Sequence, residues 1–230
     1  MRSEETLKQM EISVSGEMLQ LLAERAIYWP GRRTLLVADV HFGKAATFQH
    51  FGLGVPDGAD TGTTRDDLGR LTHLIEHTGA ERLVVLGDLL HSQHGQAAHL
   101  LELVSRWRLQ HSALELLLVR DNHDRRAGDP PDDWRVTCVE QPWPDTPFCF
   151  RHEPETDPGP SACGYSLAGH IHPAVTLQGR GKLQTRLPCF VFGANSGLLP
   201  AFGSFTGSAS RKPKIGERVF VIAGDEVVQV

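Results

Sequence analysis

Several short polar motifs hold the residues of this sequence that are best suited to bind metal ions. Carboxylate, amide and imidazole groups without thiolates suit manganese, iron or zinc better than calcium or magnesium. Two such ions about 3.5–4 Å apart lower the pKa of a shared water and stabilise the charge of an in-line displacement at phosphorus. These residue types therefore predict a two-metal phosphoester hydrolase. The motifs are Asp39-Val40-His41, Gly87-Asp88, Asn122-His123-Asp124, His152 and Gly169-His170-Ile171-His172.

The spacing within the motifs brings potential ligands together. Asp39 and His41 are two residues apart, so in an extended segment their side chains point to the same side. Asp88 follows Gly87, which permits a tight turn and leaves the carboxylate room to bridge two cations. Asn122 adds a neutral amide oxygen to a site that already holds negative charge. We therefore expect two ions to share Asp88, with the other ligands being Asp39, His41, Asn122, His152, His170 and His172.

The motifs follow short apolar runs that predict buried strands, at 34–37, 82–86, 114–119, 148–150 and 165–168. Apolar residues at helical spacing predict helices at 67–78 and 96–109. Past Trp134 the helical periodicity disappears, and short strands alternate with Gly and Pro. The order indicates an α/β (α+β) fold with a central sheet. Because loops converge at the carboxyl ends of such strands, we expect the metal site there.

Composition sets broader limits on the class of protein. With 230 residues, 40% hydrophobic and 22% charged, the chain fits one soluble globular domain, 1–230. It contains no apolar stretch of about 18 residues, as a membrane span would need. The mixed charges near the N-terminus lack the apolar segment of a secretory signal, so we expect a cytoplasmic protein. A net charge of −5 argues against a broad basic surface, but bound divalent ions would add positive charge for a nucleic acid.

The cysteines are scattered and form no Cys-x-x-Cys pair. In a cytoplasmic chain of this size, such residues are expected to be reduced and packed in the core. They are Cys138, Cys149, Cys163 and Cys189, of which Cys163, beside Gly164, is the least certain core residue.

Taken together, the motifs resemble those of the calcineurin-like metallophosphoesterases, and the resemblance extends from about residue 35 to 207. It implies a β-sandwich flanked by helices, with the metal site at the strand ends. It also implies that His123 contacts the phosphate and stabilises or protonates the leaving oxygen. The implied ligands are Asp39, His41, Asp88 and His172 for one ion, and Asp88, Asn122, His152 and His170 for the other.

Longer stretches outside the metal motifs resemble one bacterial subgroup, the ligase-associated DNA damage response endonucleases of the PdeM type. This narrower resemblance implies a manganese-dependent endonuclease, with iron or zinc as alternatives, that cleaves single-stranded or unpaired DNA. It also implies a functional association with a DNA ligase and a helicase in repair. The matching stretches are 38–48, 55–58, 87–92, 169–175 and 199–207.

Two other functions share parts of this pattern. A phosphatase or phosphodiesterase for small nucleotides or metabolites would use the same metal ligands, so the metal motifs alone do not choose between it and a nuclease. A non-catalytic scaffold of the same fold is the third candidate, but such a protein has no need to keep all the ligands and His123.

One position departs from the family pattern, which has Gly before Asn-His where this chain has Asp121. If the backbone there is left-handed, Asp tolerates it better than most residues, at some cost. Alternatively, Asp121 points away from the site and pairs with Arg120 or Arg125. On either view, we expect Asp121→Gly to leave the activity similar or higher.

A few further residues near the motifs are candidates for substrate contacts. His91 and Lys44, and Asn122 in addition to its metal role, are candidates for contacts to phosphate or to the DNA backbone. Hydrogen bonding within a loop is the alternative for His91, and a solvated position is the alternative for Lys44. Phe202 and Phe205 could stack on unpaired bases, with core packing as the alternative.

Overall fold

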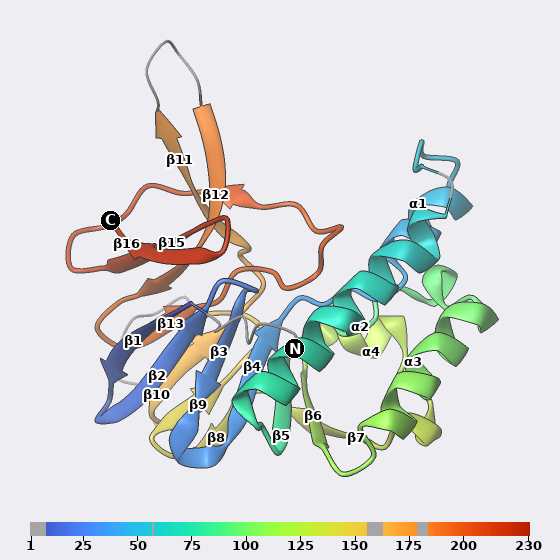
Figure 1. Cartoon of the computed structure of the whole chain (residues 1–230), viewed down its shortest axis with the longest axis horizontal. Helices are drawn as coiled ribbons and strands as arrows, with labels where there is room; N and C mark the ends of the chain where they lie inside the picture. Colours follow the sequence, from blue (N-terminus) through green and yellow to red (C-terminus); the bar gives the residue numbers. More distant parts are fainter. Residues whose placement is uncertain (1–7, 57, 156–162, 179–183) are drawn as a thin grey trace, which may run out of the picture.

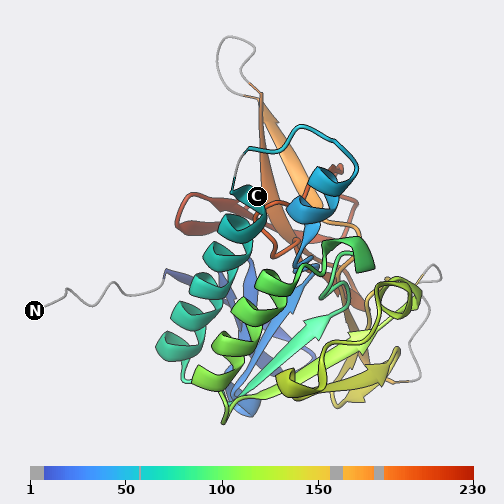
Figure 2. The same ribbon diagram turned by 90° about the vertical axis from the view of Figure 1, so that its right-hand side faces the viewer.

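The computed structural model describes residues 8–56, 58–155, 163–178 and 184–230. Asp57, which belongs to one of the matched stretches, and residues 1–7 lie outside the described residues. The elements are arranged in layers, with the long helices on one side of a first sheet and a second sheet on its other side (Figures 1 and 2). Within the described ranges, no helix is long and apolar enough to cross a membrane.

The first sheet has seven strands in sequence order, from β1 to β7. Its first four strands pair antiparallel, and β4 to β7 pair parallel. The parallel half contains the first three strands that the sequence predicts, while the antiparallel β1–β3 was not predicted. The strands are β1 (Gln9–Val14), β2 (Glu17–Leu22), β3 (Ala26–Trp29), β4 (Thr34–Ala38), β5 (Arg82–Leu86), β6 (Glu115–Arg120) and β7 (Val136–Glu140).

Strand β4 shows why the central strands are apolar along their whole length. All of its residues are buried, and successive side chains point to opposite faces of the sheet. Leu35 and Val37 pack in the core between this sheet and the helices. Leu36 and Ala38 pack in the core between the two sheets. Because both faces are covered, β4 reads as a continuous apolar run and not as an alternating one.

The two predicted helices are present, and both belong to the layer beside the first sheet. The helix predicted at 67–78 is α2, which begins earlier, at Ala59, and ends at Gly79, whose φ of 64° provides a left-handed cap. The short α1 and α4 were not predicted because one or two turns carry too little periodicity. The helices are α1 (Lys44–His50), α2 (Ala59–Thr78), α3 (Ala98–Gln110) and α4 (Asn122–Ala127), with 3-10 turns η1 (Pro30–Arg32), η2 (Gln93–Gly95) and η3 (Asp132–Trp134).

The second sheet has nine strands and is mixed. Its strands β9, β10 and β13 are parallel, and β11 and β12 form a long antiparallel pair that projects from the body of the molecule (Figure 1). As predicted, the described residues after Trp134 contain strands and no α-helix. The strands are β8 (Trp143–Asp145), β9 (Phe148–Phe150), β10 (Tyr165–Ala168), β11 (Pro173–Gln178), β12 (Gln184–Phe192), β13 (Ser196–Leu198), β14 (Ala209–Ser210), β15 (Arg218–Ala223) and β16 (Glu226–Gln229).

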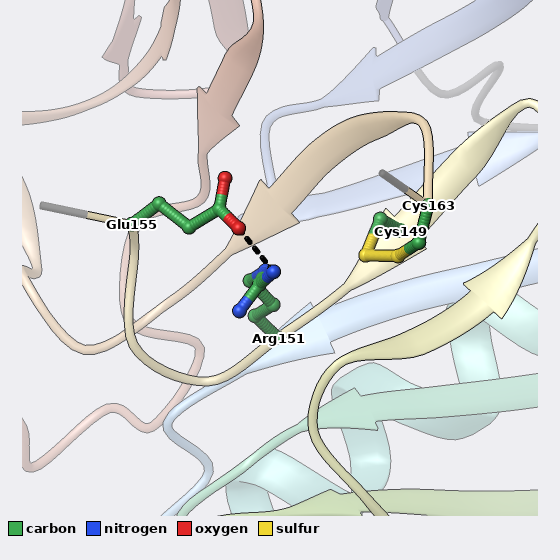
Figure 3. Close-up of a disulfide and its surroundings, with 4 residues drawn as sticks. All are labelled: Cys149, Arg151, Glu155 and Cys163. Atoms are coloured by element: carbon green, nitrogen blue, oxygen red, sulfur yellow. Dashed lines mark hydrogen bonds and ion pairs between the residues drawn. A yellow bond between two sulfur atoms is a disulfide. The ribbon is translucent and has the colours of Figure 1, made fainter. Parts of the chain in front are cut away.

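A disulfide joins Cys149 on β9 to Cys163, just before β10 (Figure 3). The expectation that both cysteines are reduced is therefore wrong. Strands β9 and β10 pair in parallel, with Tyr165 opposite Phe148 and Ser166 opposite Cys149. This pairing places Cys163, just before β10, beside Cys149, with 5.5 Å between the Cα atoms, a usual separation for a disulfide. Cys138 and Cys189 are free, as expected.

We expect Cys163→Ser to lower the free energy of unfolding by about 3 kcal/mol under oxidising conditions, because opening a loop of this length restores chain entropy to the unfolded state. Denaturant titration of both proteins measures the difference. In the presence of a reductant the wild type should lose the same stability, so the two curves should coincide. A difference that persists after reduction would mean that Cys163 contributes through packing.

Candidate metal centre

The predicted site residues lie at one end of the molecule, in loops that follow adjacent strands. Asp39 follows β4 and Asp88 follows β5, while α4 begins directly after β6. His152 follows β9, and His170 follows β10. The two sheets thus supply ligands to the same place, which confirms the prediction that the motifs meet at the carboxyl ends of the strands.

The spacing argument for Asp39 and His41 assumed an extended backbone. The structure shows that the backbone at these positions is not extended. The Asp39–His41 and His170–His172 pairs and Asp88 all have positive φ, which is uncommon for residues with side chains. Such conformations cluster at functional sites, where the surrounding structure holds them in place. The φ values are 54° for Asp39, 55° for His41, 51° for Asp88, 66° for His170 and 48° for His172.

Hydrogen bonds between loops hold these conformations. The His41 amide donates to the Asp88 carbonyl oxygen at 2.8 Å, which ties the first two motifs together. The His170 amide donates to the Asp39 carboxylate at 3.0 Å, which ties the first motif to the last. Close approach also requires glycine at Gly87, where φ is 74° and an added Cβ would lie 2.2 Å from the His152 ring.

One group of potential ligands consists of Asp39, His41 and His172, which bring one ligand atom each within 4.8 Å of one another. The His172 Nε2 lies 3.1 Å from the Asp39 Oδ1. Both ring nitrogens of His41 are buried and have no hydrogen-bond partner among the described residues. Burial, followed by the charge of Lys44, lowers the pKa of His41 to about 2, so its imidazole is neutral and has a free lone pair. A buried nitrogen without a partner fits a metal ligand.

A second group lies beside the first and contains His152 and His170. The His170 Nδ1 is 3.0 Å from the His152 Nε2. His152 is completely buried, and its Nδ1 donates to the Leu86 carbonyl oxygen at 3.0 Å. That bond selects the tautomer in which Nε2 offers its lone pair to the site. His123 joins these two imidazoles within 4.8 Å.

Asp88 lies between the two groups. Its Oδ2 is 3.6 Å from the His41 Nε2 and 3.8 Å from the His152 Nε2, so a single carboxylate oxygen is near ligands of both groups. Burial raises the pKa of Asp88, and the carboxylates of Asp39 and Asp121 add to the effect. A nearby cation would favour the ionised form. The arrangement of His and Asp side chains fits a binuclear metal site with Asp88 in the central position.

The remaining predicted site residues border these groups. Asn122 is the first residue of α4 and is exposed, and no hydrogen bond to its side chain is found within the described residues. His91 packs edge-on against His41, with 5.2 Å between ring centroids. Burial, followed by the charge of Lys44, lowers the pKa of His91 to about 4. Lys44 is half-buried at the start of α1. Burial lowers the pKa of Lys44, and the negative charges of Asp88 and Asp39 partly oppose this effect.

Asp121 belongs to the site, contrary to both views that the sequence suggested. Its φ is −121°, so the backbone is extended and not left-handed. Its carboxylate accepts the amide of His123 at 2.7 Å and that of Asp124 at 3.0 Å, which caps α4. It also accepts a hydrogen bond from the His123 Nδ1–H, with 2.9 Å between Nδ1 and Oδ2. Burial would raise the pKa of Asp121, but the hydrogen bond from the Asp124 amide and the charge of His152 outweigh it and lower the pKa.

The arginines that we expected to pair with Asp121 have other partners. Arg120 pairs with Asp129 and Glu140, and Arg125 also pairs with Glu140. The carboxylate of Asp121 is instead bonded to α4 and His123, and its Oδ2 lies 3.8 Å from the His152 Nε2 in the metal centre.

Asp124 is a further residue whose role the sequence reasoning missed. Its buried carboxylate accepts the amides of Asp88 at 3.1 Å and Leu89 at 3.2 Å, so it fixes the loop that carries Asp88. It also accepts the Asp121 amide, which completes a capping box with Asp121. The signal was present in the sequence as two carboxylates at the N-cap and N3 positions of a helix.

The two candidate stacking residues have different environments. Phe202 is completely buried and contacts the guanidinium of Arg70, 4.1 Å from the ring centroid, so it belongs to the core. Phe205 is half-buried and packs edge-on against Phe48, which in turn contacts His91.

The fold matches a solved structure over nearly the whole chain. The crystal structure of Pseudomonas putida nuclease MPE has a TM-score of 0.81 to this chain and 41% sequence identity, over 97% of this chain and 100% of that chain. The chain belongs to the metallophosphoesterase family. As a metallophosphoesterase with its His and Asp clusters intact, it is a phosphoester hydrolase and not a scaffold that has lost its ligands.

Other comparisons add little to the assignment of this metallophosphoesterase. The structure of YfcE, a phosphoesterase from E. coli, covers 86% of this chain and 97% of that chain, at 17% identity. Its TM-score of 0.39 is too low to carry an argument. No protein-family model matches the chain, and no curated protein matches it.

Proposed function

We propose that this metallophosphoesterase is a manganese-dependent DNA endonuclease that acts on single-stranded or unpaired DNA in bacterial repair. The similarity to nuclease MPE at 41% identity, over the full length of that chain, carries the proposal. The resemblance of the flanking stretches to the PdeM type supports it, and it also supports cytoplasmic work together with a ligase and a helicase. The Cys149–Cys163 disulfide argues against the cytoplasmic location, because disulfides are rare in that reducing compartment.

The ligand roles follow the two groups of side chains. Asp39, His41 and His172 would hold one ion, and Asp88, Asn122, His152 and His170 would hold the other, with Asp88 shared. Nitrogen and oxygen donors without thiolate support manganese, with iron or zinc as alternatives. Bound there, two divalent ions supply an activated water and offset the charge on the phosphate. Within the chain, Asp124 and the inter-loop hydrogen bonds keep the ligands in position.

His123 is the residue we assign to the leaving group. Its Nδ1 bonds to Asp121, so its Nε2 is available to a substrate. Half of the side-chain surface of His123 is exposed, 50%, whereas Asp121 is fully buried. A carboxylate that accepts a hydrogen bond from one ring nitrogen keeps an imidazole in one tautomer and one orientation. His123 can therefore stabilise or protonate the leaving oxygen, and Lys44, His91 and Asn122 remain candidates for contacts to the phosphate.

We expect the purified protein to nick circular single-stranded DNA when manganese is supplied, because a circle offers no ends and reports endonuclease cleavage alone. Gel electrophoresis would show conversion of circles to linear strands. Asp88→Ala and His123→Ala should abolish the nicking, while His73→Ala, at an exposed position of α2, should not. If the protein hydrolyses small nucleotides but leaves the circles intact, the result would instead support the alternative of a phosphatase or phosphodiesterase for small nucleotides.

A further inference from the structure

A cavity of about 150 Å³ lies directly beside the metal centre, with the ligand residue His172 as part of its wall. Its other polar side chains include Arg25, Arg186 and Thr206, and none of the described residues that line it carries a carboxylate. Arg25 comes from the turn between β2 and β3, and Arg186 from β12, so the two sheets each contribute one cation. The composition of the wall favours an anion.

Neither guanidinium is neutralised by an acid at hydrogen-bond distance in the described part of the chain. Arg25 donates from Nη1 to the Ala201 carbonyl oxygen at 3.3 Å, and Arg186 donates from Nη1 to the Ser208 carbonyl oxygen, also at 3.3 Å. Each guanidinium has five donors, so most remain available to a ligand. Burial lowers the pKa of Arg25, against the opposing charge of Asp67, and a bound anion would compensate that burial.

Two more observations indicate that the cavity is built for a polar ligand. The Thr206 hydroxyl oxygen is buried and has no hydrogen-bond partner among the described residues. Such groups are rare in native proteins unless a ligand or water satisfies them. Arg25 also closes the turn between β2 and β3, where its amide donates to the Leu22 carbonyl oxygen at 3.1 Å and its φ is 68°. The turn thus fixes the backbone from which Arg25 contributes to the cavity wall.

We infer that this cavity binds the phosphate of a polynucleotide strand that neighbours the phosphate held at the metals. The inference rests on the proposed function, since a mononucleotide ester has no such second phosphate. Arginine suits this task because its planar donors bind two phosphate oxygens at once. A second phosphate site next to His172 would favour strands over small esters, a choice that the metal ligands alone do not make.

The test compares a strand with a small ester in the wild type and in the double variant Arg25→Gln, Arg186→Gln. With a single-stranded oligodeoxynucleotide, the variant should show a KM raised about tenfold, as expected for lost charged hydrogen bonds. Its binding should depend less on salt, with a log–log slope reduced by about 0.7 for each lost phosphate contact. Hydrolysis of bis(p-nitrophenyl) phosphate in manganese should be unchanged, because that ester has no second phosphate to occupy the cavity.

Arg106→Gln is the matched control, because Arg106 is exposed on α3 and pairs with Glu102. A product-like inhibitor adds a readout that needs no DNA cleavage. Thymidine 3′,5′-bisphosphate should inhibit ester hydrolysis more strongly than thymidine 5′-monophosphate in the wild type, and the two should inhibit equally in the double variant.

Three results would overturn the inference. An unchanged KM for the strand would show that the arginines do not contact it. An equal loss with strand and ester would show a structural role only. A wild type that hydrolyses the ester and leaves every DNA intact would overturn the proposed function, and the subsite with it.

Discussion

Asp88→Asn should lower the rate of phosphodiester hydrolysis by about 10³-fold or more, because the carboxylate that we propose as the shared ligand would support both ions and their several kcal/mol of charge stabilisation. Its Oδ2 lies within 4 Å of imidazole nitrogens of both ligand groups, at 3.6 and 3.8 Å. Asn has nearly the same shape and lacks the negative charge. The change therefore tests the charge at the centre of the site and not the packing around it.

Metal analysis after dialysis against manganese measures the same effect directly. The wild type should retain about two ions per chain, as a two-metal site requires, and the variant should retain about one or fewer. Asp66→Asn is the control, because Asp66 is an exposed carboxylate on α2 and belongs to neither ligand group. A variant that keeps both ions and full activity would contradict the central position of Asp88.

Asp121→Gly should lower the activity by about 10–100-fold, the usual cost of removing a group that orients an active-site imidazole. This outcome reverses the expectation drawn from the sequence alone, where Gly at this position looked harmless. The structure shows a fully buried carboxylate 2.9 Å from the His123 Nδ1, and Gly removes that contact. The fold should change little, since Gly costs an N-cap only a few tenths of a kcal/mol relative to Asp.

Three measurements separate orientation of His123 from a general loss of structure. Asp121→Asn keeps an oxygen that can cap α4 and accept the His123 proton, so it should restore part of the activity. In a His123→Ala background, Asp121→Gly should cost little more, because residues that act as a unit are not additive. The loss should also be larger for esters with poor leaving groups than for p-nitrophenyl esters, which need little protonation.

An Asp121→Gly protein with wild-type activity on poor leaving groups would show that His123 needs no support from Asp121. A protein with melting temperature lowered in proportion to its activity would instead assign Asp121 to stability alone. The unfolding curve and the rates should therefore be measured on the same preparation.

The sequence predicted the parts of this protein that depend on local pattern. The apolar runs before Asp39, Asp88 and Asn122 are the buried strands β4, β5 and β6, since a strand covered on both faces must be apolar throughout. Helix α2 was predicted from its apolar stripe and from Gly79. The position of the ligands followed as well, because the carboxyl ends of parallel strands share one edge of the sheet.

Only the tertiary structure decided how these residues are used. The left-handed backbone at the ligands is imposed by bonds between loops far apart in sequence, such as that between the His170 amide and Asp39. The Cys149–Cys163 bond follows from the parallel pairing of β9 with β10, which is not a local property. The cavity of Arg25 and Arg186 exists because two sheets meet there.

The metal centre shows the same division. Residue types and spacing predicted that Asp, His and Asn side chains would hold two ions with Asp88 shared, and the structure brings the Asp and His side chains of that prediction together. The sequence alone left Asp121 unexplained, because its hydrogen-bond partners in the fold could not be predicted from the residues beside it in the chain. In the fold its carboxylate caps α4, bonds to His123 and faces His152, since contacts made by a side chain depend on what the rest of the chain brings to it.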